Sequence, residues 1–305
     1  MLKKYWLKQG KLVDEGEADA PVWVYVDPTD AERRQLVDEF GLDEHTLVSA
    51  LDPDELARLE FEPDHVALIY KRPSSYQEEG RFMFRVASTG LFLFKERLVL
   101  VQAKEPPSFD GKMFSRITSL RSLVLRLISR AVSHYWEHLK VINVATDELE
   151  AKVNASLENR YLIYMFVLQK SLVYYQSSIS SNSGLIEKLR NNAVRLEFGA
   201  DGPELLEDLS IENAQCYKQA EIYSSILAGL MDARASIVSN NLNVLMKNLN
   251  MVTIAIMVPT FVVSAFSMNV PVPMSQYPWS FWLILGMAAI SAAGWIVLWK
   301  RVRWL

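Results

Sequence analysis

The chain has 305 residues, of which 22% are charged, with a formal net charge of −4 and a pI near 5.7. A mildly acidic chain lacks the basic footprint of a nucleic-acid-binding protein, so we expect no nucleic-acid partner. The single cysteine, Cys216, excludes an intrachain disulfide and a cysteine-based metal site. These averages hide an asymmetry, because no Asp, Glu, Lys or Arg occurs from Asn248 to Trp299.

The first part of the chain has the pattern of a mixed α/β domain. No apolar segment precedes Val13, so no cleaved signal peptide is expected and this part should stay in the cytoplasm. Acidic residues near the start of the segment Asp30–Phe40 favour a helix there. Runs rich in β-branched and aromatic residues predict strands at 22–27, 64–70, 81–87, 91–94 and 98–102.

Helical periodicity follows the pair Pro106-Pro107. It extends from Ser115 to about Phe198, with Gly184 as a weak interruption, and the segment 198–203 then breaks it. Glu204 to Ser267 has no proline before Pro259, which predicts one helix of roughly 95 Å at about 1.5 Å per residue. A helix of that length is stable only when it packs against other long helices.

Two apolar segments, Leu249–Ser267 and Phe281–Trp299, are each long enough to cross the ~30 Å core of a bilayer. Three prolines between them, at 271, 273 and 278, prevent one continuous helix. Lys247 precedes the first span, and Lys300 and Arg301 follow the second, whereas the connection carries no charge. The positive-inside rule therefore predicts a hairpin with both chain ends in the cytoplasm.

The first span carries a polar stripe. Polar residues and methionines recur there at spacings of three and four, which places them on one face of a helix: Asn243, Met246, Asn250, Thr253, Met257, Thr260, Ser264 and Ser267. Polar side chains in a membrane helix normally face protein or water. One helix cannot enclose water, so a pore needs several copies around an axis. Periodicity alone leaves a second interpretation open, in which the stripe only packs helices together.

Catalytic motifs are scarce. His134, Glu137 and His138 spell H-x-x-E-H, a zinc-protease pattern, but no distant carboxylate ligand accompanies it, and two ordinary histidines on one helix face account for it better. Phosphate-binding and nucleophile-elbow motifs do not occur in the sequence. We therefore expect no enzyme and no resident cofactor.

The triplet Ser267-Met268-Asn269 resembles the Gly-Met-Asn signature of the CorA family of divalent-cation channels. The likeness extends to Trp23–Thr29, the long helix, the two terminal spans and the basic tail. It implies a pentameric funnel with an α/β cytoplasmic domain at 1–140 and a helical stalk at 141–245. The transmembrane hairpin would occupy 246–305, with a pore helix at about 246–267 and a second helix at about 280–299.

The resemblance also assigns residues. The family's pore constrictions fall on Asn243, Met246, Leu249, Met257 and Thr260, of which all but Leu249 already lie on the polar stripe. Asn250, Thr253 and Ser264 complete the expected lining, and Ser267, Met268 and Asn269 form the expected selectivity filter. The family's divalent-ion sensor implies Asp208 and Asp232 as regulatory metal ligands. Glu78 and Glu79 are the nearest acids to the other half of that sensor.

Three departures from the family pattern stand out. Ser267 replaces a glycine, a residue that tolerates unusual backbone angles better than serine does. The connection after Asn269 lacks an acidic residue, and no aspartate occupies the turn from Lys71 to Gly80.

The family implies a homopentameric channel in the cytoplasmic membrane, selective for Mg²⁺ first, with Co²⁺, Ni²⁺ or Zn²⁺ as further cargo and gated by intracellular divalent ions. The alternative is a non-conducting membrane scaffold or sensor that kept the fold but lost selectivity with the Gly-to-Ser change.

Overall fold

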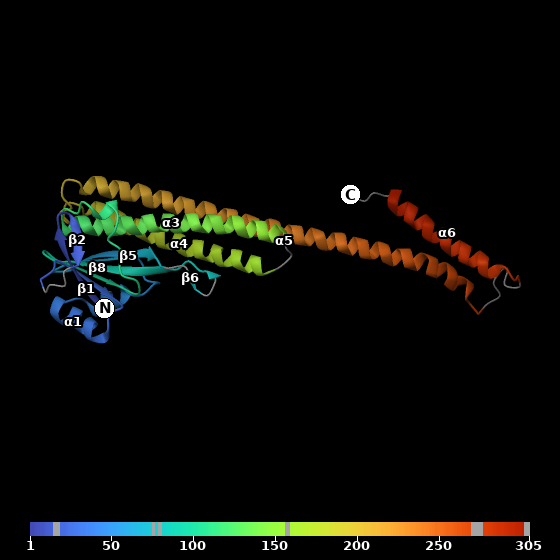
Figure 1. Ribbon diagram of the computed structural model, residues 1–305, viewed down its shortest axis with the longest axis horizontal. Coiled ribbons are helices and arrows are strands. Elements are labelled where there is room, and N and C mark those ends of the chain that lie inside the picture. The colour runs from blue at the N-terminus through green and yellow to red at the C-terminus, as the bar shows by residue number, and fades with distance from the viewer. Residues whose placement is uncertain (15–18, 75–76, 79–80, 156–158, 270–276, 302–305) are drawn as a thin grey trace. The chain divides into compact units, whose positions relative to one another are not determined.

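The computed structural model describes residues 1–14, 19–74, 77–78, 81–155, 159–269 and 277–301 (Figure 1). The chain divides into two compact units, residues 1–231 and 232–305. The longest helix, α5 (Gly202–Phe266), contributes to both of them. Each unit is described by itself below.

The first unit is built on a seven-stranded sheet in the order β2-β1-β3-β9-β8-β5-β4. Only β3 and β9 pair in parallel, and the other neighbours are antiparallel. The strands are β1 (Leu2–Lys8), β2 (Lys11–Asp14), β3 (Val22–Val26), β4 (Arg58–Phe61), β5 (Val66–Pro73), β8 (Val86–Leu93) and β9 (Leu98–Gln102). A separate two-stranded ribbon joins β6 (Gln77–Glu78) and β7 (Arg81–Phe82).

Helices cover both faces of this sheet. In β3, Trp23 and Tyr25 point into a core shared with α1 (Asp30–Phe40) and α2 (Glu44–Ser49), whereas Val22 and Val24 point into the opposite core. The opposite core is shared with α3 (Leu120–Ala155), α4 (Asn159–Asn191) and the first part of α5. Because β3 and β9 are buried on both faces, they are almost continuously apolar in sequence.

Capping interactions fix both ends of α1, through side chains at its start and through the backbone at its end. The Thr29 hydroxyl accepts a hydrogen bond from the Glu32 N–H, and the Glu32 carboxylate accepts one from the Thr29 N–H at 2.8 Å, which is a capping box. Gly41 ends the helix with φ of 64°, a left-handed conformation that costs glycine little. The predicted helix Asp30–Phe40 is confirmed at both ends.

Several other predicted elements are confirmed, and two predictions are wrong. The predicted strands at 81–87 and 91–94 are not found as such, because β7 ends at Phe82 and a single strand, β8, runs from Val86 to Leu93. The strand at 98–102 and a single helix from about residue 204 into the membrane segment are both present. Gly184 does not interrupt a helix, because α4 continues through it, and no neighbouring atom lies within 4 Å of the position of an added Cβ. The structure instead divides the predicted helical region into α3, which ends at Ala155, and α4, which begins at Asn159. The sequence patterns did not predict β1, β2, β4 or α2.

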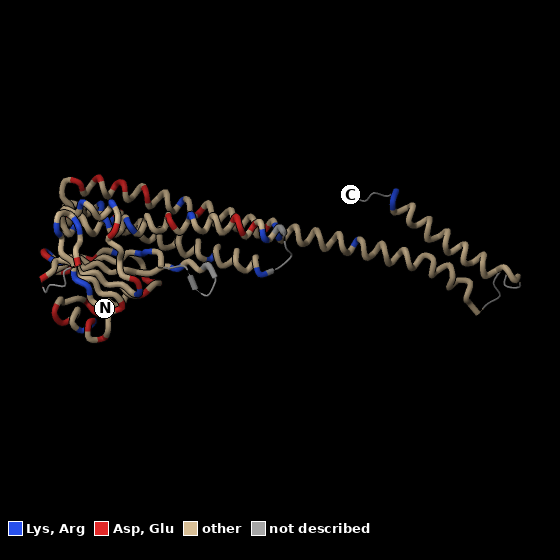
Figure 2. Tube along the Cα trace, in the orientation of Figure 1, with Lys and Arg blue, Asp and Glu red and all other residues tan. Residues whose placement is uncertain are grey.

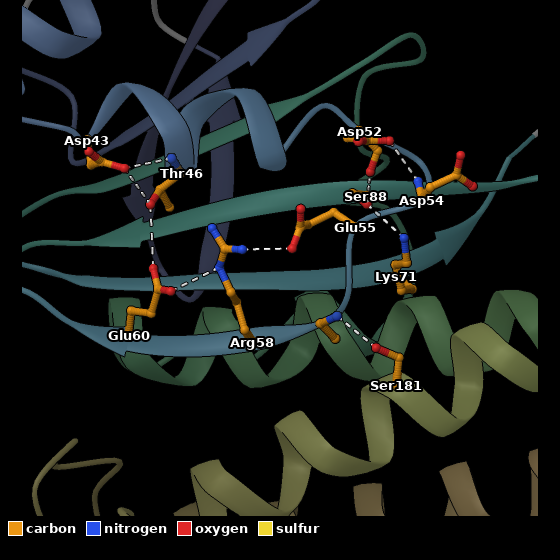
Figure 3. A network of polar contacts seen from close by, with 11 residues as sticks. Asp43, Thr46, Asp52, Asp54, Glu55, Arg58, Glu60, Lys71, Ser88 and Ser181 are labelled. Carbon is orange, nitrogen blue, oxygen red and sulfur yellow. Dashed lines mark hydrogen bonds and ion pairs between the residues drawn. The ribbon is translucent and has the colours of Figure 1, made fainter.

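Polar contacts fasten α4 to the edge of the sheet beside β4. β4 pairs with β5 only as far as Ile69, so the backbone of Lys71 has no strand partner on that side. The Asn182 side chain replaces it: its Oδ1 accepts from the Lys71 N–H, and its Nδ2 donates to the Lys71 carbonyl, both at 2.8 Å. The Ser181 hydroxyl accepts from the Ala57 N–H at 2.7 Å (Figure 3).

The Lys71 side chain is buried at the same edge. Its Nζ donates to the Pro53 carbonyl at 2.6 Å. It also donates to the Ser88 hydroxyl at 3.1 Å, and this hydroxyl donates to the Asp52 carbonyl (Figure 3). Burial lowers the pKa of Lys71, and the nearby carboxylates of Asp54 and Asp52 oppose that shift. The ammonium therefore anchors the loop after α2 to the sheet.

The second unit contains the end of α5 and α6 (Ser280–Arg301), both long and apolar enough to span a membrane. Their most apolar windows are 0% and 6% buried within the chain, unlike the core helices of a soluble protein. Figure 2 shows the end of α5 and nearly all of α6 without charged residues, with Lys and Arg at the C-terminal end of α6. The two predicted spans therefore correspond to two exposed apolar helices.

Asn182→Ala should lower the free energy of unfolding by about 2–6 kcal/mol. The substitution leaves two buried backbone groups of Lys71 unpaired, and each such group costs about 1–3 kcal/mol. Thermal unfolding of the detergent-solubilised full chain measures the effect. Asn191→Ala, at an exposed position near the end of the same helix, is the matched control and should leave stability unchanged. Equal effects of the two substitutions would contradict this role of Asn182.

Candidate ion pathway along α5

All the residues predicted to line a pore lie on α5, and their side chains are exposed. Met246, Leu249 and Met257 are 57%, 58% and 62% exposed, so nothing else in the described chain covers them. The polar members Asn243, Asn250, Thr253, Thr260 and Ser264 are exposed as well. Other apolar side chains of the same segment are also exposed, so exposure alone does not single out the stripe.

A different stripe of α5 is partly covered. The half-buried residues of this segment recur at helical spacing and lie apart from the polar stripe: Met251, Ala255, Val258, Pro259, Val262 and Phe266. These residues are apolar, as expected of a face that packs against another apolar helix. The sequence analysis did not identify this stripe, because uniformly apolar positions give no contrast between a packing face and a lipid face.

The hydroxyl groups on the polar stripe donate within the helix. Thr253 Oγ1 donates to the Leu249 carbonyl at 2.9 Å, and Thr260 Oγ1 donates to the Ile256 carbonyl at 2.7 Å. Each hydroxyl hydrogen is thereby satisfied without a partner from another helix, while the oxygen lone pairs remain available as acceptors. Rings of such oxygens suit cations better than anions.

The helix ends just before the predicted filter. Ser267 follows the last residue of α5; its N–H donates to the Ser264 carbonyl and its hydroxyl to the Val263 carbonyl, both at 3.1 Å. Non-glycine residues of the described chain with positive φ are Gln9, Asp27, Lys104 and Glu197, so Ser267 does not need the backbone freedom of glycine. Met268 and Asn269 follow it with exposed side chains.

Among the described residues, the predicted sensor acids Asp208 and Asp232 belong to no cluster of metal ligands. Asp208 and Asp232 both lie exposed on α5. Glu78 belongs to β6, and its side chain, like the whole of Glu79, lies outside the described residues. The part of the chain that the structure describes holds no group of three His, Cys, Asp or Glu residues arranged for a metal ion.

The H-x-x-E-H residues have other partners. Glu137 pairs with Arg130 at 2.7 Å, and the buried His138 Nδ1 shares a hydrogen bond with the Tyr175 hydroxyl. Burial and the nearby His134 lower the pKa of His138 to about 4, so its imidazole is neutral at pH 7. The ring of His134 meets that of His138 edge-on at 4.4 Å. This arrangement is part of a packed aromatic core, as the interpretation of two ordinary histidines requires.

Comparisons with known proteins agree on one family. The family model described as CorA-like Mg²⁺ transporter protein matches residues 18–301. The cobalt/magnesium transport protein CorA of Methanocaldococcus jannaschii is 24% identical over 296 residues, covering 93% of this chain and 91% of that protein. The protein of the same name from Thermotoga maritima is 23% identical over 303 residues, covering 95% and 85%.

A solved structure extends the likeness to three dimensions. The complete structure of the CorA magnesium transporter from M. jannaschii matches with a TM-score of 0.83, at 22% identity, over 100% of this chain and 98% of that one. At this identity the match establishes the fold, including the long helix and the two C-terminal apolar helices. Together with the family model, which matches nearly the whole length, it shows that the chain belongs to the family of CorA-like Mg²⁺ transporter proteins.

Proposed function

We propose that the protein is a homopentameric transporter of divalent cations in the cytoplasmic membrane, with Mg²⁺ as its first cargo and Co²⁺, Ni²⁺ or Zn²⁺ as further ions. The observation that carries this proposal is the exposed polar stripe of α5 in a chain of this family. Two relatives named as cobalt/magnesium transport proteins support divalent cations as the cargo. Both chain ends would lie in the cytoplasm, as the basic flanks of the spans predict.

The pore would form where α5 helices from five chains meet around one axis. Polar side chains such as Asn243, Asn250 and Thr253 would face water there instead of hydrocarbon. Rings of Met246, Leu249 and Met257 would form hydrophobic constrictions that close by dewetting. Asn243 and Thr260 would provide polar resting points between these constrictions.

Asn269 would select the ion at the outer end of the pore, beside Ser267 and Met268. Mg²⁺ releases its coordinated water reluctantly. A ring of side-chain amide oxygens would therefore recognise the hydrated ion through its water molecules and would not strip it. Because Ser267 adopts an ordinary backbone conformation, the exchange of glycine for serine leaves this filter possible.

Asp208 and Asp232 would take part in regulation from the cytoplasmic side. Cations bound between like-charged copies would hold the helices together and keep the pore closed. Depletion of the ion would let repulsion loosen the assembly, which shifts the population toward the open state. The domain limits proposed for this scheme remain 1–140, 141–245 and 246–305.

Asn269→Ala should reduce the selectivity of Mg²⁺ flux over monovalent ions by roughly tenfold or more, because each ring position loses a hydrogen-bond acceptor for a charged, hydrated ion. Flux into proteoliposomes loaded with a fluorescent indicator measures the change. Asn248→Ala is the matched control, since Asn248 lies two residues, about 200° around the helix, from the stripe residue Asn250. Unchanged selectivity of Asn269→Ala would refute the filter assignment. Absence of flux for Mg²⁺, Co²⁺ and Zn²⁺ in the unsubstituted protein would favour the non-conducting scaffold.

Met257→Ala should raise Mg²⁺ flux several-fold, because a shorter side chain widens a hydrophobic constriction and makes it easier to wet. The same proteoliposome assay applies. Met251→Ala provides the matched control, because Met251 belongs to the partly covered stripe of α5. This substitution removes the same side-chain atoms at a position away from the pore and should leave Mg²⁺ flux unchanged. A rise of equal size in both variants would place Met257 outside the constriction.

Asp208→Asn should keep the transporter open at internal Mg²⁺ concentrations that close the unsubstituted protein, since the neutral amide weakens cation binding between copies. Flux as a function of internal Mg²⁺ measures the shift of the closing concentration to higher values. Glu212→Gln removes a charge from another exposed position one turn further along α5 and should close normally. Normal closure of Asp208→Asn would remove Asp208 from the sensor.

A further inference from the structure

A second polar site lies in the first unit of the chain. A cavity of about 170 Å³ opens between β5, the start of the loop after β9 and one face of α3. Its lining includes Arg72 from β5, Glu105 from the loop, and Arg130 and His134 from α3. Two guanidinium groups and an imidazole therefore border one small space.

The Arg72 guanidinium is held in place without being neutralised. Its Nε donates to Thr89 Oγ1 at 3.1 Å, and its two Nη atoms donate to the carbonyls of Pro73 at 3.4 Å and Ala103 at 3.1 Å. These acceptors are uncharged, and within the described residues no carboxylate oxygen lies within 4 Å of this side chain. Two of its five N–H donors remain available.

The two α3 residues also have unused donor capacity. Arg130 donates from Nη1 to the Glu137 carboxylate at 2.7 Å, and its other N–H donors remain available. The His134 ring makes no hydrogen bond to any described residue, although it is partly buried. Its ring nitrogens are not among the buried polar atoms of the described chain that lack a partner, so they are accessible, and an N–H of the ring can donate to a ligand in the cavity. Burial, followed by the charges of Arg130 and Arg72, lowers the pKa of His134.

We propose that this cavity binds a small oxyanion, namely a phosphate group, held between Arg72 and Arg130 with His134 as a third donor. A guanidinium matches the oxygen atoms of phosphate through paired N–H donors, and such charge-assisted bonds are stronger than neutral ones. The bound anion would place a negative charge beside the Arg72 guanidinium, which has no carboxylate partner among the described residues. It would also link β5 to α3 across the cavity.

Glu105 sets the strength of the site. Its carboxylate lies at the same cavity and forms no ion pair within 4 Å with either arginine of the site. It therefore repels an incoming anion without blocking the donors. Removing this charge should strengthen anion binding, whereas removing the Arg72 charge should weaken it.

Calorimetric titration of the detergent-solubilised full chain with sodium phosphate tests the proposal, with sodium chloride at equal ionic strength as the reference ion. We expect saturable phosphate binding, at least about tenfold weaker binding for Arg72→Gln, and several-fold tighter binding for Glu105→Gln. Lys140→Gln removes one positive charge from an exposed position further along α3 and should bind as the unsubstituted protein does.

The proposal would be overturned if the heat released on titration with phosphate equalled that released with chloride. It would also be overturned if Arg72→Gln bound phosphate as tightly as the unsubstituted protein does. Where Arg72→Gln fails to fold, Glu105→Gln decides, because tighter binding cannot arise from unfolding and unchanged binding counts against the site. A parallel titration with glycerol phosphate shows whether the bound phosphate is a free ion or part of a larger molecule. If glycerol phosphate binds more tightly than inorganic phosphate, the site takes the phosphate group of a larger molecule. If it binds more weakly, the site takes the free ion. The proposed cation pathway does not depend on either result.

Discussion

Hydrocarbon offers no hydrogen-bond partners, and this constraint governs the membrane part of the protein. A helix satisfies its own backbone there, but polar side chains must bond within the helix or reach protein or water. Thr253 and Thr260 meet part of the requirement by donating to carbonyls four residues earlier. The amides of Asn243 and Asn250 have donors and acceptors that the described part of the chain leaves exposed. An assembly of several chains around water would satisfy them, which is why the function proposed for α5 and the oligomer proposed for the protein depend on each other.

The first unit follows a different constraint, which is the burial of a sheet on both faces. Each face needs its own helices, and the alternation of Trp23 and Tyr25 with Val22 and Val24 divides β3 between two cores. Helices α3, α4 and the first part of α5 pack on one side of this sheet. Asn182 and Lys71 then fix α4 to the sheet by polar contacts at the point where β4 ends. Apolar packing thus provides the layers, and a few buried polar groups determine their register.

Charged and titratable groups in the first unit fall into two kinds. Lys71 and His138 are buried and hydrogen-bonded within the core, the first to a carbonyl and a hydroxyl and the second to Tyr175, so they serve the packing of the core. Arg72 and His134 border a cavity with donor capacity left over. His138 is hydrogen-bonded to Tyr175, whereas the His134 ring has no hydrogen bond to a described residue. This difference in hydrogen bonding separates the structural histidine, His138, from His134, which we assign to a ligand site.

The sequence alone determined the features that depend on local spacing. The two spans, the continuous α5, the polar stripe and the limits of α1 all follow from patterns that repeat within a few residues, because helix period, capping and bilayer thickness act locally. The filter and sensor residues came from likeness to a family, and they stay predictions. Only the tertiary structure decided that Asn182 completes β5 and that Arg72 and His134 line one cavity. Asn182 and Arg72 meet partners far away in the chain, so no local period encodes these contacts, whereas Glu137 and Arg130 lie two turns apart on one helix face and their pairing is local.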